Sequence, residues 1–221
     1  MKRNTGRINT RFLVELGVLI ALELLLEMTG LGYIKTAFAE FTIMQIPVVI
    51  GAIVLGPLGG TILGAVFGLT SFWECFGKSI FGSTLLAINP FATFLMCVVP
   101  RVLMGLLCGL LFRALRRIRL PDDVEGQGRF ARALNAVLGF FRKTSVRCGI
   151  TGLAGALLNT ILFMGLLVAF FGRSDYLLSM GSANVLLFVV TMVGIQGVIE
   201  AVVCCIVSAS VSYALLKARR K

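Results

Sequence analysis

Long apolar stretches, separated by short polar connections, run along most of the chain. Six of them lie at about 12–31, 43–57, 59–73, 91–113, 145–171 and 183–216. A bilayer core about 30 Å thick takes roughly 20 residues of α-helix per crossing, so stretches of this kind predict transmembrane helices. The pattern therefore predicts an all-α integral membrane protein, with six transmembrane helices in one bundle and a single membrane domain over residues 1–221.

The second and third stretches are separated by residues 56–60 (GPLGG), which are typical of a tight turn. Charge gives a second reason to split them. Of the 21 Lys and Arg, four lie at 2–11, nine at 113–147 and four at 217–221. The positive-inside rule puts these three segments in one compartment, which requires an even number of crossings between them. We therefore predict six crossings, with both termini and the basic loop 114–144 in the cytoplasm.

The first apolar stretch could also belong to a signal peptide, because basic residues precede it and 37–39 (AFA) resembles a cleavage site. Residues 12–34 are too long for that role and contain Glu15, Glu23 and Glu27. We expect a retained helix. Glu23 and Glu27 share one helix face, and carboxylates are costly inside a membrane, so we expect a partner subunit or a water-filled cavity to cover them.

Composition agrees with a membrane location. The chain is 58% hydrophobic and 14% charged, roughly half the charged fraction of an average soluble domain. A net charge of +11 would suit a nucleic-acid-binding protein if the basic residues formed a face of a soluble fold, but here they interrupt apolar stretches. We expect lipid around the bundle and no nucleic-acid partner.

The residue types also argue against an enzyme. The chain has no histidine, which excludes a Ser-His-Asp triad, and its six cysteines form no C-x-x-C pair, so metal-ligand spacings are missing. Residues 77–79 (GKS) resemble the end of a phosphate-binding loop, but that motif requires glycine where the chain has Phe72. We expect no catalytic activity, cofactor, metal or nucleotide site, and we expect the cysteines to be reduced core or lipid-facing residues.

Function is most strongly indicated by polar side chains inside the bilayer, because such groups are costly unless they are paired or face a cavity. Arg101 lies in the middle of the fourth stretch and Glu200 in the middle of the sixth. The two could form a structural ion pair between helices, or Arg101 could be a cavity cation for an anionic solute. Other polar residues and one aromatic residue could complete an outward-open pocket or serve as interhelical hydrogen-bond partners: Thr42, Gln45, Trp73, Asn89, Thr93, Asn159, Thr160, Asn184 and Gln196.

Several segments carry a family resemblance. The most specific is 42–57 (TIMQIPVVIGAIVLGP), and weaker ones are 17–21 (GVLIA), 64–69 (GAVFGL), 100–106 (PRVLMGL), 158–160 (LNT) and 197–201 (GVIEA). Together they resemble the substrate-binding S components of energy-coupling factor (ECF) vitamin transporters, most of all the pantothenate type. Pantothenate-type members often have His where Gln45 stands, and an Asn-Gly pair is common where Gln196 stands. Folate, riboflavin or a thiamine-related vitamin therefore stays open as the solute.

The resemblance implies a six-helix, multi-pass protein of the bacterial or archaeal cell membrane that binds a vitamin with high affinity near the external face. It implies docking on a transmembrane coupling subunit, with Gly17 and Ala21 at the contact, and two ATPase subunits that supply the energy. The expected site consists of Gln45, Trp73, Asn89, Arg101, Asn159, Asn184 and Gln196, with Arg101 binding a solute carboxylate.

Two other functions stay open on the residues alone. A stand-alone secondary transporter should show inverted repeats, and the sequence shows no repeat. A membrane scaffold or sensor would use the same polar groups only for structure.

Overall fold

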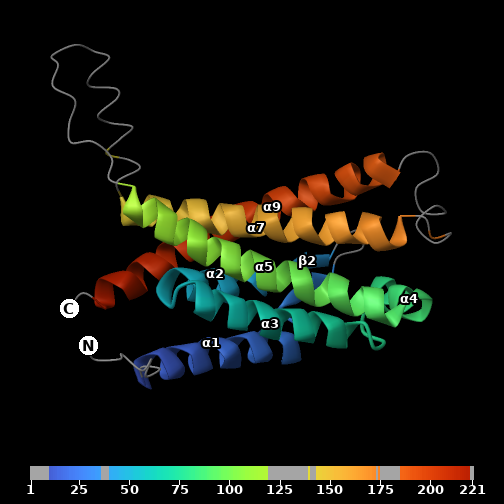
Figure 1. Ribbon diagram of the computed structural model, residues 1–221, viewed down its shortest axis with the longest axis horizontal. Coiled ribbons are helices and arrows are strands. Elements are labelled where there is room, and N and C mark those ends of the chain that lie inside the picture. Colours follow the sequence, from blue (N-terminus) through green and yellow to red (C-terminus); the bar gives the residue numbers. More distant parts are fainter. Residues whose placement is uncertain are drawn as a thin grey trace, which may run out of the picture.

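The computed structural model describes residues 10–35, 40–118, 143–172 and 185–219, together with Gly139 and Ser174. These residues form seven α-helices and one antiparallel two-stranded hairpin (Figure 1). The helices are α1 (Thr10–Met28), α2 (Gln45–Val54), α3 (Pro57–Glu74), α4 (Ile80–Ile88), α5 (Pro90–Arg117), α7 (Thr144–Phe171) and α9 (Val185–Ala218). The strands are β1 (Tyr33–Lys35) and β2 (Glu40–Thr42). Most of the predicted basic loop 114–144 lies outside the described residues.

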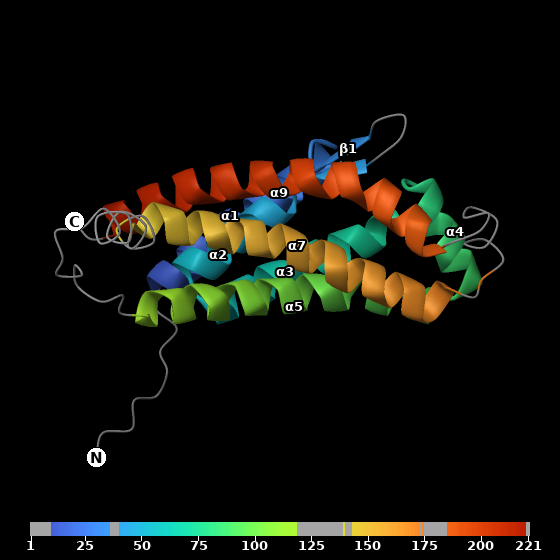
Figure 2. The same cartoon turned by 90° about the horizontal axis from the view of Figure 1, so that it is seen from above.

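The long helices lie side by side in an elongated bundle and alternate in direction (Figure 1). One end, here called the basic end, holds the start of α1, the end of α5, the start of α7 and the end of α9. The other, here called the hairpin end, holds β1, β2 and α4 (Figures 1 and 2). Within the described part of the chain, α5, α7 and the Gly197–Ala218 part of α9 are long and apolar enough to span a membrane. The protein is a helical membrane protein.

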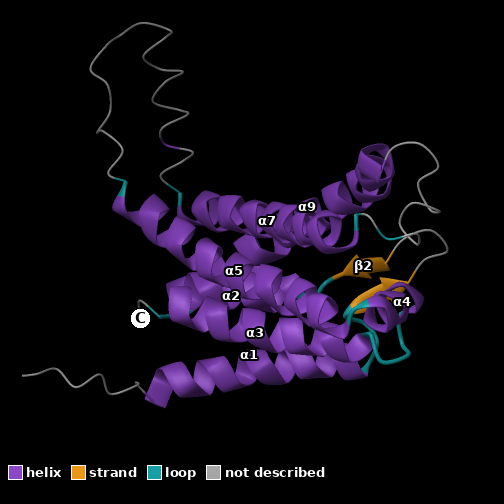
Figure 3. Ribbon diagram, turned by 45° about the vertical axis from the view of Figure 1, so that its right-hand side comes forward, coloured by secondary structure: helices purple, strands orange, loops and turns teal. Residues whose placement is uncertain are grey.

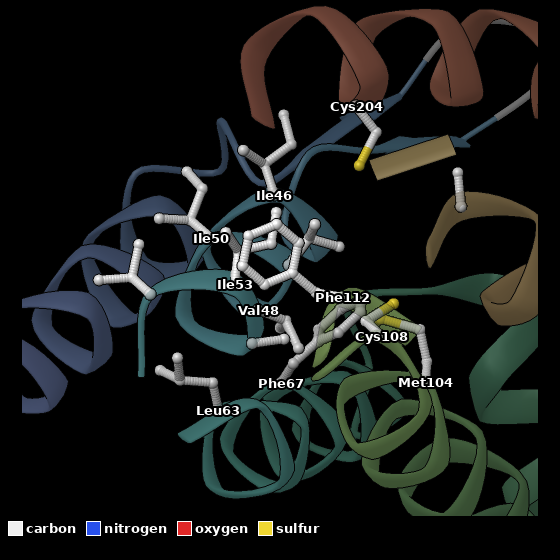
Figure 4. Packing of buried hydrophobic residues seen from close by; sticks show 14 of the residues in the cluster. Ile46, Val48, Ile50, Ile53, Leu63, Phe67, Met104, Cys108, Phe112 and Cys204 are labelled. Carbon is white, nitrogen blue, oxygen red and sulfur yellow. The ribbon is translucent and has the colours of Figure 1, made fainter. Parts of the chain in front are cut away.

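Helix α2 forms the centre of the bundle. All ten of its residues are buried, and it packs against α1, α3, α5, α7 and α9. Its Ile46, Val48, Ile50 and Ile53 lie in one hydrophobic cluster with residues of α3, α5 and α9 (Figure 4). A helix that is apolar on all sides is stable only when other helices surround it. Helix α2 has ten residues and is therefore shorter than the predicted stretch 43–57. A helix of ten residues spans about 15 Å, half the thickness of a bilayer core.

Glycine and proline end α2 and start α3. Helix α2 ends at Val54, Gly56 has a φ of +87°, and Pro57 occupies the first turn of α3. Glycine adopts a positive φ without the steric penalty of a Cβ, and proline at the first helical position lacks only an N–H that has no partner within the helix. The break between these helices therefore lies in the segment whose sequence is typical of a turn.

Helices α3 and α5 pack backbone to backbone through glycines spaced four residues apart. A Cβ added to Gly60 would lie 2.4 Å from the carbonyl oxygen of Gly105, and one added to Gly64 would lie 2.2 Å from that of Arg101. Only residues without side chains allow membrane helices to approach so closely. The backbone of Arg101 is thereby held against α3.

Two connections contain structure that the apolar pattern did not predict. The hairpin occupies the first connection at the hairpin end, with Tyr33 paired to Thr42 (Figure 3). Helix α4 occupies the second connection; the Ser79 hydroxyl accepts a hydrogen bond from Gly82 N at 3.3 Å and caps its start. Both elements are short, so their sequences give little periodic signal.

Candidate functional site

Polar side chains from six elements form a layer across the bundle, one helical turn from a glycine contact. A Cβ added to Gly155 of α7 would lie 2.6 Å from Val49 Cγ2 of α2 and 3.1 Å from Cys108 Sγ of α5. Asn159 is one turn from Gly155 toward the hairpin end, and Gln45 is one turn from Val49 in the same direction. Since residues four apart share a helix face, Gln45 and Asn159 face the same level of the interior.

Arg101 lies at this level from the side of α5. Its guanidinium is buried, donates to the carbonyl oxygen of Met96 at 3.1 Å, and lies 4.6 Å from the ring centre of Phe163 and 5.3 Å from that of Phe67. Phe163 is one turn beyond Asn159 on α7. Aromatic faces attract cations, so the two rings hold the guanidinium in place without neutralising its charge.

The hairpin formed by β1 and β2 contacts the same region from the hairpin end of the bundle. Thr42 donates its backbone N–H to Glu200 Oε1 at 2.8 Å, which fastens β2 to α9. Tyr33, opposite Thr42 in the hairpin, has its hydroxyl near Arg101 and Ser71. Burial raises the pKa of Tyr33, and the charge of Arg101 opposes that shift, so the phenol is neutral and can donate a hydrogen bond.

We call Thr42, Gln45, Arg101, Asn159 and Glu200, together with Tyr33, the polar layer. Five of its buried atoms have no hydrogen-bond partner among the described residues: the Tyr33 hydroxyl oxygen, Thr42 Oγ1, Gln45 Oε1, Arg101 Nε and Asn159 Oδ1. A buried polar group without a partner costs roughly 1–3 kcal/mol, and native proteins rarely keep several together. The polar layer therefore has the chemistry of a site that a polar solute would complete.

The structure does not form the Arg101–Glu200 ion pair that the sequence left open. Within the described residues, the guanidinium of Arg101 contacts Met96 and two phenylalanine rings, whereas the carboxylate of Glu200 accepts from Thr42. Glu200 has a further interaction in addition to this one. The ion-pair interpretation is therefore wrong, and the interpretation of Arg101 as a cation for an anionic solute stays a prediction.

Four of the seven expected site residues lie outside this layer or cannot be compared with it. Trp73 is 67% exposed and lies beside Phe76 at the end of α3, with ring centres 6.3 Å apart. Asn89 is exposed and caps α5, where its Oδ1 accepts from Ala92 N at 3.1 Å. Asn184 and the side chain of Gln196 lie outside the described residues.

Sequence reasoning missed three contributors to the site. Tyr33 was hidden in a connection without helical periodicity. Phe67 and Phe163 belong to apolar stretches in which any aromatic residue could face lipid. The sequence does contain a signal for Phe163, because it follows Asn159 by four residues and the ring and the amide therefore share a face of α7.

A second charged cluster lies at the hairpin end. Lys78 Nζ lies 3.1 Å from Glu27 Oε1 and 3.2 Å from Glu74 Oε1, and hydrogen bonds to these carboxylates raise the pKa of Lys78. Glu23, one turn before Glu27 on α1, is fully buried within the chain. Lys78 binds Glu27 Oε1, but Glu27 Oε2 and both carboxylate oxygens of Glu23 have no hydrogen-bond partner among the described residues. The expectation that a partner subunit or a water-filled cavity covers these carboxylates stays a prediction.

The opposite face of α1 is open. Gly17 and Ala21 are exposed, and a Cβ added to Gly17 would meet nothing within 4 Å. Leu13, Val14 and Val18 are exposed around them. This face combines small and large apolar side chains, which suits contact with lipid or with another helix.

A family model for the substrate-specific component of ECF transporters matches residues 11–212, which is nearly the whole chain. The chain belongs to this family. The S component also shares 34% identity over 108 residues with the pantothenate transporter PanT of Leuconostoc mesenteroides. That similarity covers 47% of the S component, which spans about half the length of the curated relative it matches. Membership identifies the protein as a transporter component, as the resemblance in sequence indicated.

Proposed function

We propose that this S component binds pantothenate in the polar layer and delivers it to an ATP-driven importer. The observation that carries the proposal is Arg101, a buried guanidinium with Nε unpartnered and with no carboxylate hydrogen-bonded to it among the described residues. A buried cation is stable only with a counter-charge or strong hydrogen bonds, and a solute carboxylate supplies both.

Pantothenate matches the other groups of the layer. It carries one carboxylate, one amide and two hydroxyls. With the carboxylate on Arg101, its hydroxyl and amide donors suit acceptors such as Gln45 Oε1 and Asn159 Oδ1, which have no partner in the described chain. Asn184 and Gln196 are proposed as further contacts from the sequence alone. Trp73 and Asn89 are left out of the proposed site.

The ligand proposal is tested by titrating purified protein, freed of co-purified solute, with pantothenate and with pantothenol, its neutral alcohol analogue. Riboflavin, thiamine and folate serve as competitors. We expect nanomolar-type affinity for pantothenate and binding of pantothenol at least tenfold weaker, since a hydrogen bond to a charged group contributes about 1.5–3 kcal/mol. Equal affinity for the acid and the alcohol, or tighter binding of another vitamin, would refute the assignment.

We further propose that the basic end faces the cytoplasm and the hairpin end faces outward, with six crossings in the bacterial or archaeal cell membrane. The support is the positive-inside rule applied to the three basic segments. This orientation puts the hairpin end on the side from which a nutrient arrives.

The exposed face of α1 is the proposed docking surface for a coupling subunit that carries two ATPases. Gly17 and Ala21 allow a helix to approach closely, and neither contributes to the core. Replacing both by Leu should abolish ATP-dependent uptake in reconstituted vesicles and leave pantothenate affinity unchanged. A matched variant, Gly165→Leu on the exposed face of α7, should keep uptake. Normal uptake by the Gly17/Ala21 variant would mean that the coupling subunit docks on another surface.

A further inference from the structure

The basic end contains a hollow that the proposed transport function does not use. Two adjoining cavities, about 550 Å³ and 260 Å³, share Ile53, Val54 and Arg116 in their walls. The larger extends along the last turns of α5, past Arg113 and Arg117, and the smaller lies between α5, the first turn of α7 and the end of α9. The cavities lie where α5 and α9 end and α7 begins, whereas Arg101 of the polar layer lies about half-way along α5.

Among the described residues, positive side chains outnumber negative ones around this hollow. The walls include five guanidinium groups, those of Arg113, Arg116, Arg117, Arg147 and Arg219. Glu15 is the acidic side chain that the described residues place at this end, and it pairs with Arg11 and Arg219. The C-termini of α5 and α9 contribute roughly half a negative charge each, so in the described part of the chain the three arginines of α5 still give an excess of positive charge.

The side chains of Arg113, Arg116 and Arg117 make no hydrogen bond or ion pair to the described residues. All three are exposed on the last turn and a half of α5. Arg219 differs, because it also donates to the carbonyl oxygen of Val54 and so closes the end of α2. The three arginines of α5 are therefore available to an external anion, while Arg219 forms part of the wall behind it.

We infer that this hollow binds the phosphodiester headgroup of an anionic phospholipid. Guanidinium groups bind phosphate oxygens through paired N–H donors, and basic pockets between transmembrane helices bind such headgroups. The apolar wall formed by Ile53, Val54, Leu55 and Phe112 continues from the arginines into the bundle, which suits the glycerol and upper acyl carbons. Helix α5 is long and apolar enough to span a membrane, and Arg113, Arg116 and Arg117 lie on its last turn and a half, at the depth of lipid headgroups, so the lipid is a better fit than a soluble phosphate.

The test uses the intact protein in nanodiscs that contain equal amounts of phosphatidylglycerol and phosphatidylcholine. Lipids that remain bound after release are counted by native mass spectrometry. Wild-type protein should retain phosphatidylglycerol over phosphatidylcholine at least fivefold. The double variant Arg113→Gln/Arg116→Gln should fall below a twofold preference. Thermal unfolding in detergent checks that the variant folds.

A charge-matched control separates the pocket from general attraction. Lys143→Gln/Lys217→Gln removes two exposed charges from the same end but outside both cavities, and it should keep the fivefold preference. Equal loss in both double variants would overturn the inference in favour of diffuse electrostatics. Displacement of the bound lipid by millimolar glycerol phosphate or inorganic phosphate would overturn it in favour of a soluble anion.

Discussion

Gly155 sets the separation of α2 and α7 one turn from the polar layer. Any side chain there would collide with Val49 and Cys108, and neither has a flexible end that can move away. The positions of Gln45 and Asn159 relative to one another therefore depend on a residue that touches no solute. A single methyl group added at Gly155 would therefore change the geometry of the polar layer.

Gly155→Ala should lower stability and weaken solute binding together. The added methyl group forces the helices apart, and overpacking of this kind costs about 1–3 kcal/mol. Gly165→Ala on the same helix meets open space and removes the entropic cost of glycine, so it should leave the unfolding midpoint unchanged or slightly raised. Thermal unfolding with and without pantothenate measures both effects. A Gly155→Ala protein as stable as the Gly165→Ala protein would contradict the close contact.

Single residues of the proposed site were predictable where their residue type is unusual within an apolar stretch. Arg101, Gln45 and Asn159 stand out because charges and amides are rare within apolar stretches. Asn89 stands out equally by type, but its amide caps α5, and the apolar pattern does not separate a capping amide from a binding one. Trp73 lies near the end of α3, and its side chain is exposed instead of facing the polar layer. The apolar pattern does not locate a helix face to within one residue, and a difference of one residue moves a side chain from the interior to the surface.

At the scale of elements, the hairpin connects the polar layer to the hairpin end of the bundle. Among the described residues, the hairpin backbone is joined to α9 by the hydrogen bond from Thr42 N–H to Glu200. Because Tyr33 lies opposite Thr42, this bond also determines where the phenol lies relative to Arg101. A two-stranded hairpin of this length is not stable alone, so its position depends on such contacts.

Glu200→Ala should loosen the hairpin and speed solute release. A hydrogen bond to a carboxylate contributes about 1.5–3 kcal/mol, so we expect the dissociation rate of pantothenate to rise roughly tenfold or more. Glu200→Gln keeps an acceptor oxygen and should stay within about threefold of wild type. Stopped-flow displacement with excess unlabelled solute measures the rates. If the alanine variant releases solute at the wild-type rate, the hydrogen bond has no part in closing the site.

Long elements were predictable from the apolar pattern, and short ones were not. The ends of α3, α5 and α7 lie within about four residues of the stretches 59–73, 91–113 and 145–171. Membrane helices follow hydropathy closely, since every backbone group must be bonded within the span. Helix α4 and the hairpin lack such a signal, because nine-residue and three-residue elements at a bundle end depend on tertiary contacts.

At the scale of the whole molecule, charge and structure agree on a two-ended bundle. The described ends of α1, α5, α7 and α9 that border the basic segments all lie together, and the hairpin and α4 lie at the far end (Figures 1 and 2). The sequence predicted this grouping because a single rule on Lys and Arg applies to every connection. The compartment that each end faces stays a prediction.

Labelling of single cysteines tests that orientation. In a background without the native cysteines, Ile80→Cys at the hairpin end should react with a membrane-impermeant maleimide in intact cells, since Ile80 is 85% exposed. Gly126→Cys in the basic loop should react only after permeabilisation. The reverse pattern would put the polar layer on the cytoplasmic side and exclude its proposed role in uptake.

The central claim is that Arg101 binds the carboxylate of the solute, and a two-ligand comparison tests it most directly. Affinities for pantothenate and pantothenol are measured on wild type and on Arg101→Met, which keeps much of the side-chain volume but removes the charge. We predict that pantothenate binds the variant about 10- to 100-fold more weakly, whereas pantothenol changes by less than about threefold. An equal loss for both ligands, or no loss for pantothenate, would contradict the account.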